Sequence, residues 1–148
     1  MKIFIGADHN GFQFKQDLTK FLASAGHEVI EEGNVMSDPN DDFPQFAGRT
    51  VNDLLASGDT EARGLLICGS GQGMCMAANR FKGIRASLCW NLEEARASRN
   101  DDDSNVLCLS ARSLSLNEAQ SIITVFLNTP FAGAPRFVRR LNELDQLG

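Results

Sequence analysis

The chain has 148 residues, of which 43% are hydrophobic and 22% charged, and its formal net charge is −5. This size and composition predict one globular domain over residues 1–148, with a core that needs neither disulfides nor metals. An acidic chain without a basic tract is not expected to bind nucleic acid or an anionic membrane, and no apolar run reaches membrane-spanning length.

The cysteines and the N-terminal residues indicate the cellular compartment that is expected for this chain. The four cysteines show no C-x-x-C spacing and have no histidines nearby, which predicts neither a zinc site nor a disulfide framework. We expect Cys75, Cys89 and Cys108 to be core residues. Residues 1–6 are typical of a first strand and not of a signal peptide. A reducing, cytoplasmic location is therefore expected.

Apolar runs alternate with helical patterns along the whole chain. In order, the expected elements are strand 3–5, helix 12–25, strand 28–31, helix 43–57, strand 65–67, a helix from residue 74 to about 80, strand 83–89, helix 92–100, strand 105–109, and helices 115–128 and 135–147. Gly26 and Gly58 are expected to end the first two helices, Pro44 suits the first turn of the second, and Asn91 is an expected cap.

This alternation predicts an α/β fold. Strands and helices that alternate at this spacing form a parallel sheet with helices on both faces, here a three-layer α/β/α sandwich with five parallel strands in a Rossmann-like arrangement. Ligands of such sheets bind outside the carboxyl ends of the strands. Four expected strand ends carry reactive or polar residues, which favours a site: Asp8 and His9, Cys68, Trp90 and Asn91, and Ser110 to Arg112.

The most informative stretch is a strand, a cysteine, a glycine-rich turn and a helix start. It reads Cys68, Gly69, Ser70, Gly71, Gln72, Gly73, Met74. A helix start offers unpaired N–H groups and a partial positive charge, and glycines let the backbone approach a ligand closely. A thiol at this position is expected to ionise more easily than a free one. The pattern would place a base beside an oxyanion cradle.

Common glycine motifs do not match this turn. Met74 stands where a dinucleotide fingerprint needs its third glycine, no Lys-Ser or Lys-Thr follows as in a Walker loop, and Cys68 stands where a serine-hydrolase elbow needs glycine. The residues themselves leave two interpretations open. One is a tight structural turn with an inert, buried cysteine, and the other is a catalytic thiol beside an anion site.

Several motifs follow one another along the chain: residues 6–12 (GADHNGF), 67–73 (ICGSGQG), 77–80 (AANR), 83–86 (GIRA) and 104–107 (SNVL), with Arg112, Arg136 and Arg140. In this order and at these intervals they resemble the ribose-5-phosphate isomerase B and galactose-6-phosphate isomerase family over nearly the whole chain.

The resemblance implies aldose–ketose isomerisation through an enediolate, without metal or cofactor. Cys68 would move the proton between neighbouring carbons, backbone N–H groups from Gly71 to Met74 would stabilise the oxyanion, and Ser70 would help to position it. Asp8 would orient sugar hydroxyls. His9, Arg112, Arg136 and Arg140 would bind the phosphate. The remaining expected substrate-binding residues are Gly69, Gln72, Gly73 and Asp102.

Three parts of the chain depart from the family pattern. The family usually has His-Asn-Asp where this chain has Asp101, Asp102 and Asp103, and the family's first histidine there is assigned to ring opening. A second family histidine is Phe137 here, and a tyrosine is Phe43. We therefore expect that Asp101 opens the sugar ring, or that the substrate differs in ring or stereochemistry. A solvated helix terminus is the alternative for the aspartates.

The sequence thus predicts an isomerase that interconverts ribose 5-phosphate and ribulose 5-phosphate. Alternatives are the same chemistry on allose or galactose 6-phosphate, and a binding module that holds phosphosugars without turnover. Family resemblance also implies a homodimer with shared sites, in which the helix at about 135–147 reaches the partner subunit; dimers that pair into tetramers stay an open alternative. A solvated helix face is the alternative for Arg136 and Arg140, which are four residues apart.

Overall fold

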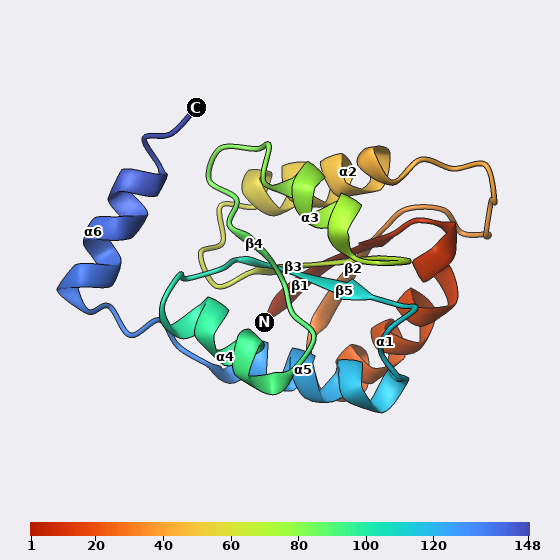
Figure 1. The fold of residues 1–148 in the computed structure, drawn as a ribbon. Coiled ribbons are helices and arrows are strands. Elements are labelled where there is room, and N and C mark those ends of the chain that lie inside the picture. The colour runs from red at the N-terminus through yellow and green to blue at the C-terminus, as the bar shows by residue number, and fades with distance from the viewer.

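Five parallel strands form the centre of the molecule in the computed structural model, which describes all 148 residues (Figure 1). The strands are β1 (Lys2–Ala7), β2 (Glu28–Glu32), β3 (Arg63–Cys68), β4 (Ala86–Leu88) and β5 (Val106–Ser110). The helices are α1 (Phe12–Ser24), α2 (Phe43–Ala56), α3 (Gln72–Ala78), α4 (Leu92–Asn100), α5 (Leu116–Asn128) and α6 (Pro135–Leu144), with a short 3-10 helix, η1 (His9–Gly11).

The strand order is β2-β1-β3-β5-β4, and every neighbouring pair is parallel. The connection after β1 leads to β2 on one side, and the chain then returns to place β3 on the other side of β1. The direction of winding therefore reverses between β1 and β3. A crevice at the carboxyl ends of these two strands is the usual ligand position in open parallel sheets.

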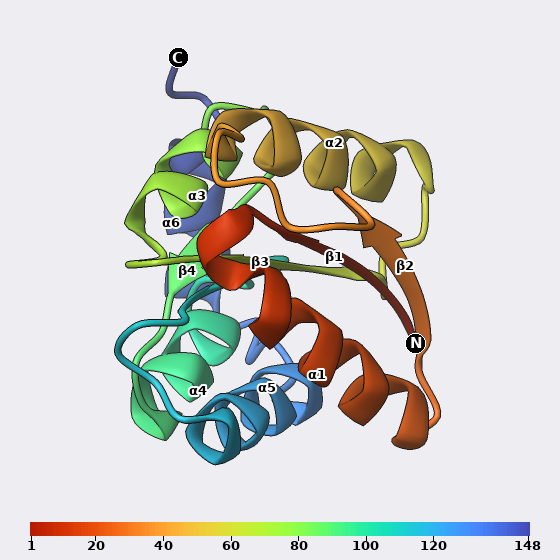
Figure 2. The ribbon, with the colours of Figure 1, turned by 90° about the vertical axis from the view of Figure 1, so that its right-hand side faces the viewer.

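Helices cover both faces of the sheet (Figure 2), as the predicted three-layer sandwich requires. Two apolar clusters pack on opposite faces because alternate strand residues point in opposite directions. Ile67 of β3 contributes to the cluster with α1 and α5, whereas Leu66 and Cys68 contribute to the cluster with α2 and α3. The side chain of Cys68 therefore lies on the α2–α3 face.

Several local signals act as expected. Pro44 occupies the first turn of α2, and the Asn91 side chain accepts a hydrogen bond from the Glu94 N–H, 2.8 Å. The start of α5, in addition, is a capping box that was not predicted from the sequence, in which Ser115 and Glu118 each bond the other's backbone N–H. These caps supply partners for N–H groups that a helix start otherwise leaves free.

Some boundaries differ from the expected ones. The edge strand β4 covers only 86–88 instead of 83–89, because it pairs with β5 over three residues alone. Helix α3 begins at Gln72 rather than at residue 74, and α6 ends at Leu144 rather than 147. Lys15 of α1 is buried and pairs with Glu31 of β2 at 2.9 Å, which the apolar spacing of α1 did not predict. No helix combines the length and apolarity that a membrane crossing requires.

Candidate active site

The expected site residues fall into two groups at opposite ends of the parallel strands. We call these ends the carboxyl edge and the amino edge of the sheet. We call the first the carboxyl-edge group: Asp8, His9, Cys68, the turn 69–74 and Arg112. The second, the amino-edge group, comprises Asp101, Asp102, Arg136 and Arg140. In Figure 1 the turns of the first group lie at the right of the sheet, and α6 of the second lies at the left.

Cys68 is the last residue of β3 and is 6% exposed in the single chain. Its Sγ accepts a hydrogen bond from the backbone N–H of Gly71, 3.2 Å. Gly71 adopts φ 77°, and an added Cβ would lie 2.5 Å from the Leu88 side chain. Glycine at this position therefore lets the turn curl back over the sulfur. The thiol therefore faces a backbone donor.

The turn after Cys68 presents backbone donors at the start of α3. The Gln72 N–H donates to the Ser70 hydroxyl at 3.3 Å. The N–H groups of Gly73 and Met74 make no hydrogen bond within the chain. These two groups are the free donors of the first helical turn. The ring of Phe43 lies against Gly73, whose added Cβ would be 2.9 Å from it, and so covers one side of the turn.

The β5 end fixes this turn from the other side. The Ala111 N–H donates to the Cys68 carbonyl and the Arg112 N–H to the Gly69 carbonyl, both at 3.0 Å. The Ser110 hydroxyl also donates to the Gly69 carbonyl, 2.8 Å. A Cβ on Gly69 would lie 2.9 Å from a guanidinium nitrogen of Arg112. The exposed Arg112 therefore lies directly over the glycine-rich turn.

Asp8 stands at the end of β1, beside β3. It is 7% exposed, and its Oδ1 accepts hydrogen bonds from the N–H groups of Asn10 at 3.0 Å and Gly11 at 3.2 Å. Burial raises the pKa of its carboxyl, while the Gly11 hydrogen bond and the nearby His9 oppose that rise. Gly11 packs against the Ile67 backbone so closely that a Cβ would lie 2.7 Å away, which holds η1 beside Cys68.

His9 follows and is held by a residue that the sequence interpretation missed. Asp41, in the loop before α2, accepts from the His9 backbone N–H at 3.0 Å and lies 2.7 Å from Nδ1. The Asp41 hydrogen bond is the main cause that raises the pKa of His9. Because Asp38, Asp41 and Asp42 crowd the same loop, composition does not indicate which carboxylate reaches His9.

The amino-edge group lies at the other end of the strands. Asp101 caps the end of α4, and the chain then enters β5 at Val106, which pairs with Gly64 at the beginning of β3. Ser110 pairs with Cys68 at the opposite end. Five strand residues, roughly 13 Å, separate these edges. Asp101 and Asp102 therefore do not meet Cys68 within one chain.

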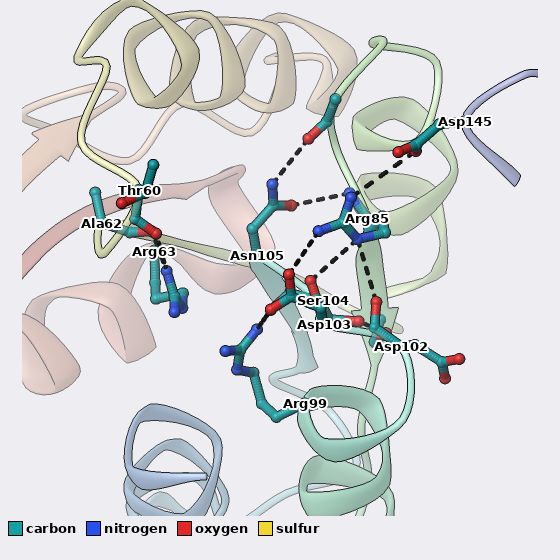
Figure 3. Close-up of polar contacts among 12 residues, drawn as sticks. Thr60, Ala62, Arg63, Arg85, Arg99, Asp102, Asp103, Ser104, Asn105 and Asp145 are labelled. Atoms are coloured by element: carbon teal, nitrogen blue, oxygen red, sulfur yellow. Dashed lines mark hydrogen bonds and ion pairs between the residues drawn. The ribbon is translucent and has the colours of Figure 1, made fainter. Parts of the chain in front are cut away.

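Two arginines hold the segment that carries these aspartates (Figure 3). Arg85 bonds the Asp103 carboxylate at 2.9 Å and donates to the Asp102 and Asp103 carbonyls, both at 3.1 Å. Arg99 is 4% exposed; it bonds the other Asp103 oxygen at 2.8 Å and the Ser104 carbonyl at 2.6 Å. This clamp holds Asp103 at φ 46°, a left-handed conformation that is uncommon for a residue other than glycine.

Helix α6 belongs to the same edge and stands apart from the three layers in Figure 1. Arg85 lies 3.8 Å from Asp145 at its end, and the two arginines Arg136 and Arg140 are exposed. Burial, and then the like charge of Asp101, raise the pKa of Asp102, while Arg140 opposes the rise. Arg140 and the aspartate pair are therefore electrostatic neighbours.

The structure thus brings together Asp8, His9, Cys68, the turn and Arg112, and separately brings together Asp101, Asp102 and the α6 arginines. It contains no group of three or more His, Cys, Asp or Glu residues arranged to hold a metal ion. Cys89 and Cys108 are buried, as expected, whereas Cys75 is only half-buried.

The known proteins to which this chain is similar are named as sugar-phosphate isomerases. The family model described as Ribose/Galactose Isomerase matches residues 3–144. Ribose-5-phosphate isomerase B of Mycolicibacterium paratuberculosis is 33% identical over 146 residues, covering 99% of this chain and 91% of the relative. The Escherichia coli protein of the same name is 37% identical over 132 residues, covering 89% and 87%.

Solved structures agree. Ribose-5-phosphate isomerase B of Clostridium thermocellum matches with a TM-score of 0.93 at 36% identity, covering 99% of this chain and 96% of that one. The Mycoplasma genitalium enzyme, solved with bound ribulose-5-phosphate, also has a TM-score of 0.93 at 36% identity and covers 98% and 94%. The predicted α/β fold and the family resemblance are both confirmed.

Proposed function

The chain belongs to the ribose/galactose isomerase family, and from that premise we propose that it interconverts ribose 5-phosphate and ribulose 5-phosphate through an enediolate, with Cys68 as the base. The observation that carries the mechanism is the contact between Cys68 Sγ and the Gly71 N–H, beside the two free N–H groups of Gly73 and Met74. A ribulose-5-phosphate complex of a relative at 36% identity supports this choice of sugar.

The proton transfer follows from that arrangement. The Cys68 thiolate takes the proton from C2 of the open-chain aldose, and negative charge develops on the carbonyl oxygen. Backbone N–H groups of the turn stabilise this oxyanion, with Ser70 helping to position it. The hydroxyl proton on O2 moves to the O1 oxyanion, which shifts the negative charge to O2; the thiol formed on Cys68 then returns its proton to C1 as the C2 carbonyl forms, and the ketose results. Asp8 orients the sugar hydroxyls from the adjacent strand end.

Phosphate binding and ring opening involve both groups. We assign the phosphate to His9 and Arg112 from one chain and to Arg136 and Arg140 from a second, since guanidinium groups match phosphate oxygens. Asp101 is our candidate for ring opening, with Asp102 beside it.

A homodimer supplies the geometry that one chain lacks. The amino-edge group is remote from Cys68 in its own subunit, while α6 stands away from the sandwich and exposes its arginines. If each carboxyl edge faces a partner's amino edge, the two groups complete one site. The dimer, its possible pairing into tetramers and the cytoplasmic location stay predictions.

The decisive experiment is a coupled assay on ribose 5-phosphate, allose 6-phosphate and galactose 6-phosphate with the wild type and Cys68→Ala. We expect turnover to be fastest on ribose 5-phosphate and to fall by about 10³-fold in Cys68→Ala. Cys75→Ala is the matched control and keeps its activity. Binding without turnover on all three sugars would contradict the proposal, as would undiminished activity in Cys68→Ala.

A further inference from the structure

We propose that Asp41 is a positioning residue that fixes His9 as an imidazolium, so that Nε2–H donates to the anionic end of the substrate. The inference rests on the proposed function only in that it identifies this anion with the sugar's phosphate. It assigns a role to the loop of residues 33–42, which the mechanism above does not use.

The geometry of the pair is that of a two-point clamp. The same oxygen, Asp41 Oδ1, accepts from the His9 backbone N–H at 3.0 Å and lies 2.7 Å from its Nδ1. The other carboxylate oxygen lies 3.5 Å from the Asn34 amide nitrogen. The Asp41 side chain is 7% exposed and that of His9 30% exposed. The carboxylate is thus enclosed, while the imidazole keeps an accessible side.

The clamp decides what the free ring nitrogen can do. A carboxylate accepts hydrogen bonds, so Nδ1 must carry a proton toward Asp41. In the neutral ring Nε2 would then be a lone-pair acceptor, which repels phosphate oxygens. Only the imidazolium has a second N–H to donate. Anion binding by His9 therefore requires the charged ring.

The surrounding charges favour that charged form. The Asp41 hydrogen bond raises the pKa of His9 most, and the negative charges of Asp41, Asp8 and Asp38 add to the rise, while burial opposes it. The side chains of Arg112 and Asn10 both lie against Gly69. With a raised pKa, the imidazolium is complete at low pH and persists to a higher pH than in a free histidine. Anion binding is then lost as pH rises through that raised pKa.

The first test reads His9 directly. The chain has only two histidines, and the one hydrogen bond of the His27 side chain is with the N-terminal amine, so His27→Gln leaves a single imidazole for NMR titration. In that background, Asp41→Asn should make His9 titrate at lower pH. Asp42→Asn removes the same charge one residue away and should leave the titration unchanged. Asp41→Glu, which restores a carboxylate, should titrate between the wild type and Asp41→Asn.

The second test measures anion binding with sulfate, a tetrahedral dianion whose charge is constant over the pH range used. We expect sulfate affinity at pH 7 to fall about tenfold in Asp41→Asn and to be unchanged in Asp42→Asn. Under turnover, KM for ribose 5-phosphate should rise about tenfold while kcat changes by less than about twofold.

Two results would overturn the inference: a His9 titration that is the same in Asp41→Asn and the wild type, or equal sulfate affinity in the two folded proteins. Failure of the proposed function is separable. If the wild type turns over no aldose phosphate, yet Asp41→Asn still lowers the titration of His9 and weakens sulfate binding, the isomerase proposal is refuted and the role of Asp41 is supported.

Discussion

The carboxyl edge of the sheet offers mainly backbone donors, whereas the amino edge offers charged side chains. At the carboxyl edge a curled glycine turn directs an N–H at Cys68 and leaves two more unpaired. At the amino edge Arg85 and Arg99 hold Asp103, and exposed arginines project from a helix that stands apart. The groups of the first edge contact one another within one chain, whereas those of the second lie remote from Cys68 in that chain.

This difference suggests a division of labour. Stabilising a developing oxyanion requires fixed donors, which a turn tied to β3 and β5 provides. Binding a phosphate and opening a ring require charge and proton transfer, which side chains provide. The variants below test each edge, beginning with the largest expected effect.

Gly71→Ala should disable the carboxyl edge. The new Cβ would meet Leu88 at 2.5 Å and the Leu109 backbone at 3.0 Å, at a residue with φ 77°. The turn must shift, and its N–H groups leave the position of the oxyanion. We expect kcat on ribose 5-phosphate to fall by about 10²- to 10³-fold.

Gly58→Ala is the control for backbone strain, because Gly58 also has a positive φ, 63°, but an added Cβ would meet nothing within 4 Å. It should keep kcat within about twofold of the wild type. An equal loss of kcat in Gly71→Ala and Gly58→Ala would show that strain at a positive φ causes the loss, and that displacement of the oxyanion donors does not.

Arg140→Ala should weaken the amino edge without affecting proton transfer. Loss of a charge-assisted hydrogen bond to phosphate should raise KM about thirtyfold and leave kcat nearly unchanged. Arg139→Ala removes the neighbouring exposed charge on the same helix and should leave KM unchanged. Steady-state kinetics on both variants measures the two KM values. An equal KM for Arg140→Ala and Arg139→Ala would indicate that Arg140 lies on a solvated helix face and does not bind the phosphate.

Asp101→Asn should separate ring opening from proton transfer. We expect turnover of ribose 5-phosphate to fall about tenfold, since an amide cannot transfer the proton. Ribulose 5-phosphate has no ring to open, so deuterium exchange into its C1 from solvent should continue. The same pattern in Asp102→Asn alone would move the role to Asp102, whose pKa is raised by burial.

The effect of Asp8→Asn on stability should be the smallest of the effects described here. Because burial raises the pKa of Asp8, the folded state binds this proton more tightly than the unfolded state. The charged carboxylate therefore costs stability once pH rises through the raised pKa, and not below the unfolded value. Urea unfolding from pH 3 to 8 should show Asp8→Asn gaining up to about 1 kcal/mol over the wild type toward neutral pH. A constant difference at all pH values would contradict this.

Much of the carboxyl edge could be predicted from the sequence because its signals are local. Strand, cysteine and glycine turn are contiguous, and Pro44 and the Asn91 cap each lie within one turn of the helix start that they mark. The distance between Cys68 and Asp101 could not be predicted from the resemblance to the family alone. It follows from α4 running back along the sheet, which returns the chain to the amino edge before β5.

Side-chain pairs between residues far apart in the chain could not be predicted from the sequence either. Asp41 reaches His9 across 32 residues, and Lys15 reaches Glu31 across 16. Neither pair has a local pattern, since any of several acidic residues could have met each cation. The clamp on Asp103 likewise depends on Arg85 and Arg99 arriving from separate elements.

Complementation between two variants, measured at ribose 5-phosphate concentrations far below KM, tests most directly whether the two edges form one site across subunits. Cys68→Ala would remove proton transfer at the carboxyl edge of one chain, and a double Arg136→Ala, Arg140→Ala variant would remove phosphate binding at the amino edge of the other, so that each variant alone has little activity. Co-expressed, mixed dimers contain one intact site, and about a quarter of wild-type activity should return. If activity stays at the level of the separate variants although mixed dimers form, the two edges do not share a site and the account is wrong.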